Sequence, residues 1–193
     1  MGQISLRWRA YCVGSIPLIR NTDGFGGNVS NGNRNTIMTD GRISETLDNL
    51  AKMNGSLEEA LRAIPNERMK TQYSPEVWSP HQILGHLVDA EIAFSFRLRK
   101  ILAEENPSYP PFDEERWGER LRHEDIPVLL FVSVWKPLRE LNIQLLRLMP
   151  ALAWERQGVH ETSGSQTLMD VVRGMILHDN YHLKQLKACG TSA

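Results

Sequence analysis

The stretch TLMDVVRGMILHDNYHLKQLKACG, residues 167–190, decides the fold. Thr167 and Asp170 stand three residues apart, which is the spacing of a capping box at the start of a helix. Apolar residues then recur every three or four positions, the period of an amphipathic helix. They are Leu168, Val171, Met175 and Leu186. Because His178 and His182 lie on the same side, the stretch predicts a helix that carries two histidines toward a protein interior.

Three earlier segments show the same helical period, and they span roughly residues 43–64, 79–105 and 125–148. In the third segment the predicted buried stripe consists of Leu130, Val134, Leu138, Leu141, Leu145 and Leu148. No segment shows convincing alternation of the kind that a half-buried strand requires. The sequence therefore predicts an all-α four-helix bundle over roughly residues 40–190.

Local signals mark where these helices begin and end. Ser79-Pro80-His81-Gln82 combines a capping box with proline at the first helical position, so we expect the second helix to begin there. The connection over residues 106–125 contains three prolines and clustered charges, and it is predicted to be a long loop with a helical turn near Glu114–Leu121. Loops of this length inside compact domains are often functional. Pro137 predicts a kink in the third helix, or a start after it.

Charge divides the chain into two unlike parts. Residues 1–37 carry four arginines and one acidic residue, a net charge of +3, and 6 of the 14 glycines, with no regular periodicity. Residues 38–193 carry 18 basic and 22 acidic side chains, a net charge of −4. We interpret residues 1–37 as a disordered leader or as the product of a start codon assigned too early, with Met38 as the initiator. Residues 38–193 are then the bundle domain.

The composition of the whole chain excludes several classes of protein. With 193 residues, the chain is long enough for one domain with a sizeable core. A net charge of −1 argues against nucleic acid as a partner, and no run reaches the roughly 18 apolar residues of a membrane span. Cys12 and Cys189 are too few for a disulfide framework. We therefore expect a cytoplasmic protein that acts on a small molecule.

Three histidines form the candidate metal site. His178 and His182 stand at i and i+4, which places both imidazoles one turn apart on one helix face. His86 stands between the apolar Ile83 and Leu87, so it is expected to face inward as well. Buried imidazoles need partners for their nitrogens, and a shared divalent metal would supply one. Three histidines without a cysteine suit Zn, Ni, Fe or Mn and leave coordination positions open.

The other polar candidates have lesser expected roles. His81 and His123 are expected to face solvent. The acids Asp89, Glu91 and Asp179 are expected either to face solvent or to orient neighbouring ligands. His160 lies in a predicted loop and is expected to cap it, and Cys189 is expected to be a bystander. Glu91 and His160 are weak candidates for proton transfer. The sequence contains no G-x-S-x-G, phosphate-binding glycine loop or H-E-x-x-H motif.

At these residues the chain resembles the DinB-like superfamily of four-helix-bundle metalloproteins, over roughly Ile43 to Leu186. The matching elements are Trp78-Ser79-Pro80 leading into ILGHLVDAE, the WGER turn, Trp154-Glu155-Arg156-Gln157-Gly158-Val159-His160, Gly164, Thr167-Leu168 and HDNYHLKQL. The resemblance rests on the two histidine motifs in this order. Either motif alone would be unspecific.

The resemblance implies an up-down-down-up bundle, often dimeric, with a divalent metal held by three histidines. These map onto His86, His178 and His182. It also implies an activity related to thiol-dependent transferases and isomerases or to metal-dependent hydrolases. One departure is visible, because members often carry a Phe-x-x-x-Arg pattern in the third helix, whereas Phe131 is followed four residues later by Trp135. A substrate contact through that arginine is therefore not predicted.

Three functional hypotheses remain open. The first is an enzyme in which the metal activates water or a low-molecular-weight thiol, as a hydrolase or a thiol S-transferase. The second is a metal-binding, stress-related or regulatory module without turnover. The third is a plain bundle whose histidines coincide by chance. A homodimer is also compatible with the sequence, through an apolar surplus that comprises Phe94, Phe96, Trp135 and Val132.

Overall fold

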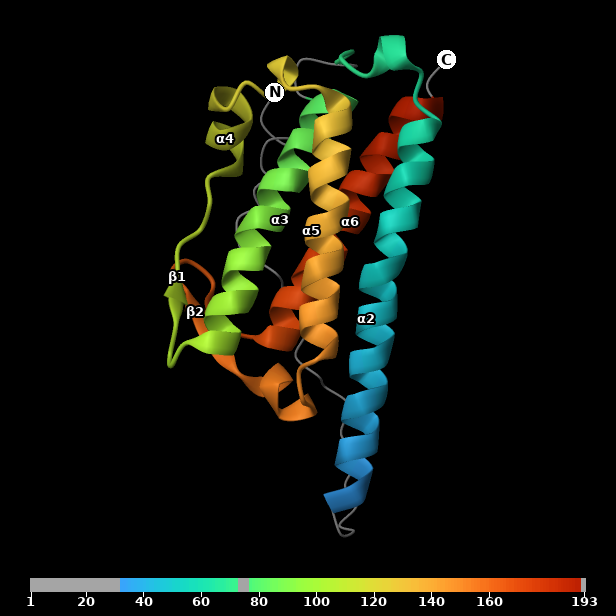
Figure 1. The fold of residues 1–193 in the computed structure, drawn as a ribbon. Helices are drawn as coiled ribbons and strands as arrows, with labels where there is room; N and C mark the ends of the chain where they lie inside the picture. The colour runs from blue at the N-terminus through green and yellow to red at the C-terminus, as the bar shows by residue number, and fades with distance from the viewer. Residues whose placement is uncertain (1–31, 73–76, 192–193) are drawn as a thin grey trace, which may run out of the picture.

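Four long helices dominate the part of the chain that the structure describes (Figure 1). The computed structural model describes residues 32–72 and 77–191. The helices are α2 (Gly32–Arg62), α3 (Pro80–Ala103), α5 (Val128–Arg147) and α6 (Leu168–Thr191). Helices α2 and α6 run in one direction and α3 and α5 in the other, so the order is up-down-down-up. This confirms the predicted all-α four-helix bundle.

The parallel pair α3 and α5 determines how the chain is connected. Both α2 and α3 pack against α5 and α6, which places α2 and α3 on a diagonal of the bundle. Because α3 and α5 run in the same direction, the chain must return along the bundle between them (Figure 1). This crossover, residues 104–127, contains the long loop that the prolines predicted.

The crossover contains short elements of its own. They are β1 (Ser108–Tyr109), α4 (Glu114–Arg120) and the 3-10 turn η2 (His123–Asp125). Helix α4 confirms the predicted helical turn, and Asp113 caps it by accepting a hydrogen bond from the backbone N–H of Arg116 at 3.0 Å. Helix α4 packs against α3 near the end where α3 begins (Figure 1). The crossover therefore covers the first turns of α3.

A small sheet lies at the opposite end of the bundle, and the expectation of no strands was wrong. Strands β2 (Gln157–His160) and β3 (Gly164–Thr167) form an antiparallel hairpin after the 3-10 turn η3 (Ala151–Glu155), and β1 pairs in parallel with β2. Strands of two and four residues are too short to show alternation in a sequence. The hairpin holds the chain in place where it turns into α6.

Both predicted capping boxes are confirmed. Ser79 accepts a hydrogen bond from the backbone N–H of Gln82, whose side chain accepts one from the backbone N–H of Ser79. Thr167 and Asp170 make the same reciprocal pair at the start of α6. These side chains satisfy N–H groups that have no partner within the helix.

Helix α2 begins at Gly32, well before the predicted start near Ile43, and its first turns extend past the end of the bundle (Figure 1). These turns continue an existing helix, and propagation is far easier than nucleation, so they need no apolar stripe. The predicted division into a leader over residues 1–37 and a domain over residues 38–193 stays a prediction. Residues 1–31 lie outside the described residues.

The buried face of α5 differs from the prediction. Of the predicted stripe, Leu130, Val134, Leu141 and Leu148 are exposed, and Leu138 and Leu145 are half-buried. The buried side chains are instead Phe131, Trp135, Arg139, Asn142, Ile143 and Leu146. Two of these are polar, so the hydrophobic pattern favoured the wrong face. Pro137 is exposed within a continuous helix, so the alternative start after it was also wrong.

Two apolar clusters fill the bundle, with polar side chains between them. One cluster includes Leu57, Leu84, Trp135 and Leu186, and the other includes Leu50, Leu98, Ile143 and Met175. The buried residues between them along α3, α5 and α6 form what we call the polar layer, namely Glu91, Ser95, Arg139, Asn142 and Asp179. No helix within residues 32–72 and 77–191 combines the length and apolar character that crossing a membrane requires.

Candidate metal centre

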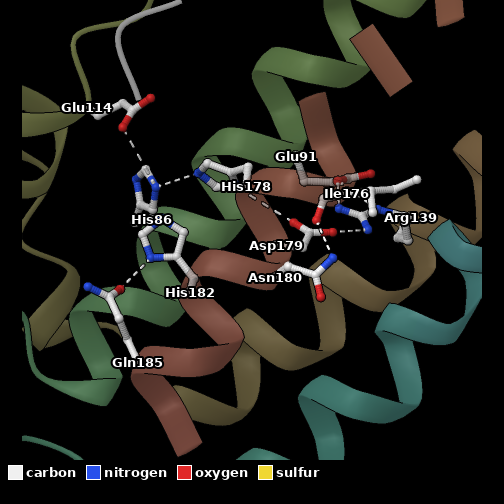
Figure 2. A network of polar contacts seen from close by, with 10 residues as sticks. All are labelled: His86, Glu91, Glu114, Arg139, Ile176, His178, Asp179, Asn180, His182 and Gln185. Atoms are coloured by element: carbon white, nitrogen blue, oxygen red, sulfur yellow. Dashed lines mark hydrogen bonds and ion pairs between the residues drawn. The ribbon is translucent and has the colours of Figure 1, made fainter. Parts of the chain in front are cut away.

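Three histidine side chains meet inside the bundle beside the polar layer (Figure 2). His86 lies in the second turn of α3, and His178 and His182 lie on successive turns of α6. One ring nitrogen of each lies within 4.8 Å of the others, and all three residues are buried. The Nε2 atoms of His86 and His178 are 2.8 Å apart. The structure thus brings together the three histidines singled out in the sequence.

His182 has a ring nitrogen without a partner. Its Nδ1 lies 2.8 Å from Oε1 of Gln185, which can only accept, so Nδ1 carries the proton. Its Nε2 is then an unprotonated acceptor, and this buried atom receives no hydrogen bond from the residues that the structure describes. Leaving such an acceptor unsatisfied in a protein interior is costly. A divalent metal is a group that satisfies this lone pair.

Burial favours the neutral form that metal binding requires. Burial lowers the pKa of His182 to about 3, aided by repulsion from His178 and opposed by the hydrogen bond to Gln185. Burial also lowers the pKa of His86 well below its usual range, followed by repulsion from His182 and His178. Because only neutral imidazole coordinates a metal, these two rings are in the form that can bind one at neutral pH.

The polar layer reaches the histidines through Asp179 (Figure 2). Its Oδ1 lies 3.6 Å from Nδ1 of His178, and its Oδ2 accepts a hydrogen bond from Nη1 of Arg139 at 2.5 Å. Burial acts to raise the pKa of Asp179, but attraction to Arg139 and the hydrogen bond that Arg139 donates outweigh burial, so the pKa is lowered. The ionised carboxylate therefore faces His178, as carboxylates that orient metal-binding histidines do.

The opposite side of the polar layer is held by Glu91. Arg139 donates from Nε and Nη2 to Oε2 of Glu91 at 2.9 and 2.5 Å. Asn142 donates to Oε1 of Glu91 at 2.6 Å and to Oγ of Ser95 at 2.5 Å, and it accepts from Arg99. Both oxygens of Glu91 are therefore engaged within the layer.

Aromatic rings and the crossover cover the three histidines. The ring of Trp78 lies 4.9 Å from that of His86 and 6.4 Å from that of His182, and the ring of Phe112 lies 6.3 Å from that of His86. Glu114, the first residue of α4, places Oε2 at 3.9 Å from Nε2 of His86, and its side chain is 12% exposed. The crossover thus places a carboxylate beside the histidine cluster (Figure 2).

Two glycines allow the crossover to approach α3 closely. A Cβ on Gly118 would lie 3.2 Å from the ring of Trp78. A Cβ on Gly85 would lie 2.5 Å from the ring of His123, whose Nε2 is 2.9 Å from Oδ2 of Asp89. Any larger residue at position 85 would displace His123, so glycine there permits the contact that holds the crossover over the site.

Comparison with known proteins places the chain in a family. The family model described as the DinB superfamily matches residues 49–186. The chain belongs to the DinB superfamily. A relative from Oceanobacillus iheyensis is 27% identical over 144 residues, which cover 75% of this chain and 83% of the relative. A relative from Bacillus mycoides is 23% identical over 145 residues, with the same coverage. Both carry the name "Putative metal-dependent hydrolase".

A solved structure supports the fold of this DinB superfamily member. YfiT from Bacillus subtilis matches with a TM-score of 0.71 and 19% identity, covering 87% of this chain and 93% of YfiT. Its structure is described as that of a probable metal-dependent hydrolase with an unusual four-helix bundle topology. At this level of identity the match establishes the shared fold.

Several residues of this DinB superfamily member lie elsewhere than expected. His81 and His123 are buried rather than exposed, because Nε2 of His81 lies 2.7 Å from the carbonyl of Ile126 and His123 contacts Asp89. The expected solvent-facing option for three acids is also wrong, since Asp89, Glu91 and Asp179 are all buried. Trp135, expected on an apolar surface, is buried as well.

Two other expectations concern residues outside the histidine cluster. His160 lies on β2, where its Nδ1 accepts hydrogen bonds from the backbone N–H groups of Thr162 and Ser163, so it caps the hairpin turn as expected. The thiol of Cys189 is buried and its pKa is raised by burial, which agrees with the expected role as a bystander.

Sequence reasoning missed Glu114 and Arg139. Glu114 is one of several acids in the crossover, and only its place at the start of α4 beside His86 distinguishes it. Arg139 follows Trp135 by four residues, the spacing of the Phe-x-x-x-Arg pattern sought at Phe131. The available signal was therefore an aromatic residue four positions before an arginine, namely Trp135 and Arg139. This pair lies one helical turn after Phe131, where the pattern was sought.

Proposed function

We propose that this DinB superfamily member is a metal-dependent enzyme in which His86, His178 and His182 hold one divalent cation. The observation that carries the proposal is the buried, unprotonated Nε2 of His182, which lies in the histidine cluster and has no hydrogen-bond partner within residues 32–72 and 77–191. Bonds of about 2.0–2.1 Å place two ligand nitrogens no more than about 4.2 Å apart, so small ring rotations suffice. The donor set suits Zn, Ni, Fe or Mn.

When bound, a divalent metal lowers the pKa of water or of a thiol and so supplies a nucleophile at neutral pH. The residues of the chain do the rest. Asp179 orients His178, Gln185 fixes the protonated nitrogen of His182, and Glu114 is placed to accept the proton that the nucleophile releases. Trp78 and Phe112 restrict water around the histidines. Glu114 replaces Glu91 and His160 as the candidate for proton transfer.

The nucleophile determines which reaction follows. Water makes the protein a hydrolase, in line with the names of its relatives, and a low-molecular-weight thiol makes it a thiol S-transferase. In either case the substrate is a small molecule and the protein acts in the cytoplasm. The alternative is a metal-binding module without turnover, and the carboxylate of Glu114 beside His86 favours the enzyme.

A homodimer belongs to the same proposal. The outer side of α5 exposes Leu130, Val134 and Leu141, and α3 exposes Ile92 and Phe96 on the neighbouring helix. Since exposed apolar patches of this kind mark interaction sites, we infer that this side contacts a second copy. Sedimentation velocity should show a dimer for the unaltered chain and a monomer for Leu141→Glu. An unaltered chain that stays monomeric at all concentrations would refute the inference.

Metal stoichiometry tests the proposed function. Elemental analysis of the purified protein, followed by titration of the metal-free protein with zinc, should give about one metal per chain. His182→Ala should weaken zinc affinity by about tenfold or more. His160→Asn is the matched control, because it alters a buried histidine outside the cluster. Less than about a tenth of a metal per chain, with His182→Ala unchanged, would refute the site.

Activity separates the enzyme from the module. Ester and amide hydrolysis, and conjugation of a thiol to an electrophile, should each be measured with and without added metal. A rate that needs metal and falls in Glu114→Gln, with zinc binding intact, supports the enzyme. Metal binding without any turnover across both screens would favour the non-catalytic module.

A further inference from the structure

Arg97 of α3 is a half-buried cation surrounded by aromatic rings. Its guanidinium carbon lies 5.5 Å from the ring centroid of Phe94, 5.7 Å from that of Tyr109 and 6.0 Å from that of Phe112. Among the residues that the structure describes, no hydrogen bond or ion pair reaches this guanidinium. Burial lowers its pKa, partly offset by Tyr109 and Glu114. Aromatic faces attract a cation but do not use its five N–H donors.

Three other arginines in the bundle show what a satisfied guanidinium looks like here. Arg139 binds two carboxylates, Arg99 donates to the carbonyl of Ser95 and to Asn142, and Arg156 donates to the carbonyls of Ile101 and Glu104. Each of them is held by oxygen acceptors. Arg97 differs, because its surroundings are aromatic and its donors remain available.

The rings around Arg97 also line the histidine cluster. The ring of Phe94 lies 5.8 Å from that of His178, edge to face, and Phe112 lies 6.3 Å from His86. One aromatic ring therefore separates the guanidinium from the cluster on each of two sides. A small molecule with an anionic group on Arg97 would extend along these rings toward the three histidines.

The geometry points to Arg97 as the binding site for a carboxylate on the substrate or co-substrate, with Phe94 and Phe112 flanking the molecule. This inference rests on the proposed function and adds the substrate class, a small molecule with a carboxylate at the end remote from the reacting atom. A guanidinium pairs with a carboxylate through two parallel hydrogen bonds, which fixes orientation as well as position. Arg97 is thus a specificity-determining residue.

The test compares hexanoate with hexanamide, which have the same shape and differ in charge. In the metal-free protein, both are titrated while the side-chain Nε–Hε resonance of Arg97 is followed by NMR. Hexanoate should bind about tenfold more tightly and shift this resonance, because a charged hydrogen-bonded pair forms only with the carboxylate. The unaltered protein suffices for this measurement.

Variants then assign the preference to one side chain. Arg97→Gln should abolish the preference for hexanoate and leave the affinity for hexanamide unchanged. Arg116→Gln removes an exposed arginine of α4 and should retain the preference. Thermal unfolding checks that both variants fold, and Arg97→Lys provides a second variant, with an intermediate preference expected because lysine lacks the planar fork.

Three results would overturn the inference. The first is equal affinity for hexanoate and hexanamide. The second is a preference for hexanoate that survives in Arg97→Gln. The third is a preference for hexanoate that appears only after zinc is added and survives in Arg97→Gln, because this result would place the carboxylate on the metal. Zinc binding with no preference due to Arg97 would refute this inference alone. A preference due to Arg97 in a protein that binds no metal would refute the proposed metal function alone.

Discussion

Replacing Arg139 with methionine tests whether the polar layer is a single unit. The guanidinium is 1% exposed and lies between the carboxylates of Glu91 and Asp179, which are 0% and 5% exposed. Methionine has a similar length, so the change removes the charge and leaves little cavity. Breaking a buried ion pair typically costs about 3–5 kcal/mol, because the remaining charge stays buried without a partner. A domain is stabilised by only about 5–15 kcal/mol in all.

We therefore expect Arg139→Met to lose about 3–5 kcal/mol of unfolding free energy at pH 7, measured by urea denaturation of the metal-free protein. Without Arg139, the attraction that lowers the pKa of Asp179 is lost and burial raises this pKa, so the folded variant binds a proton more readily than the unfolded chain. Its deficit against the unaltered protein should therefore shrink from pH 7 to pH 5. Adding Glu91→Gln and Asp179→Asn should recover most of the loss.

The single variant Arg139→Met should bind zinc about tenfold more weakly, since Asp179 loses the partner that holds it toward His178. Arg116→Met, in an exposed arginine, is the control and should change stability by less than about 0.5 kcal/mol. A loss below about 1 kcal/mol in Arg139→Met, or a deficit that does not depend on pH, would refute the interpretation of the layer as one buried charge unit.

Three further predictions follow from the same structure. The unfolding free energy of the metal-free protein should fall by up to about 1.4 kcal/mol per pH unit as the pH falls from about 6.5 toward 3. The reason is that His182 is protonated in the unfolded chain over this range, whereas in the folded protein its pKa of about 3 keeps it neutral. Urea denaturation in the presence of EDTA measures this loss. Ser79→Ala should cost about 1 kcal/mol in urea denaturation, since the cap of α3 is lost, whereas Ser79→Asn should retain most of it. Zinc at a hundred times its dissociation constant should raise the unfolding free energy by about 2.7 kcal/mol, so calorimetry should show a loss of this size when the zinc is removed. In His182→Ala, calorimetry with and without zinc should give the same stability.

The helices and the histidine cluster were predictable because their signals are local. The i, i+4 spacing of His178 and His182 lies in phase with the apolar stripe of α6, and Ser79 and Gln82 announce the start of α3. Such patterns depend on one helix alone, so they survive whatever the rest of the chain does. The third candidate ligand, His86, was found in the same way, from the apolar residues on either side of it.

The failures at the candidate site involve residues whose partners are distant in sequence. His81 and His123 looked like surface residues, yet both are buried where the crossover meets α3, because His81 of α3 contacts Ile126 and His123 of the crossover contacts Asp89 of α3. Arg139 and Asn142 look like solvent-exposed residues in a leucine-rich helix, and only α3 and α6 supply the acceptors that allow their burial. Polar burial is set by tertiary pairing, which a hydrophobic pattern does not contain.

The polar layer is difficult to explain by stability. Two carboxylates and one guanidinium lie in the middle of the bundle between two apolar clusters. Replacing such a buried ionic group with apolar residues of the same volume often leaves a protein equally or more stable. With both carboxylates ionised, the layer carries a net charge of −1, and the carboxylate nearer to the histidines faces His178. A buried negative charge at this position favours a cation on the far side of the imidazole. The layer therefore makes physical sense as the electrostatic support of the proposed metal site, and the zinc affinity of Arg139→Met and of the charge-free triple variant measures that support directly.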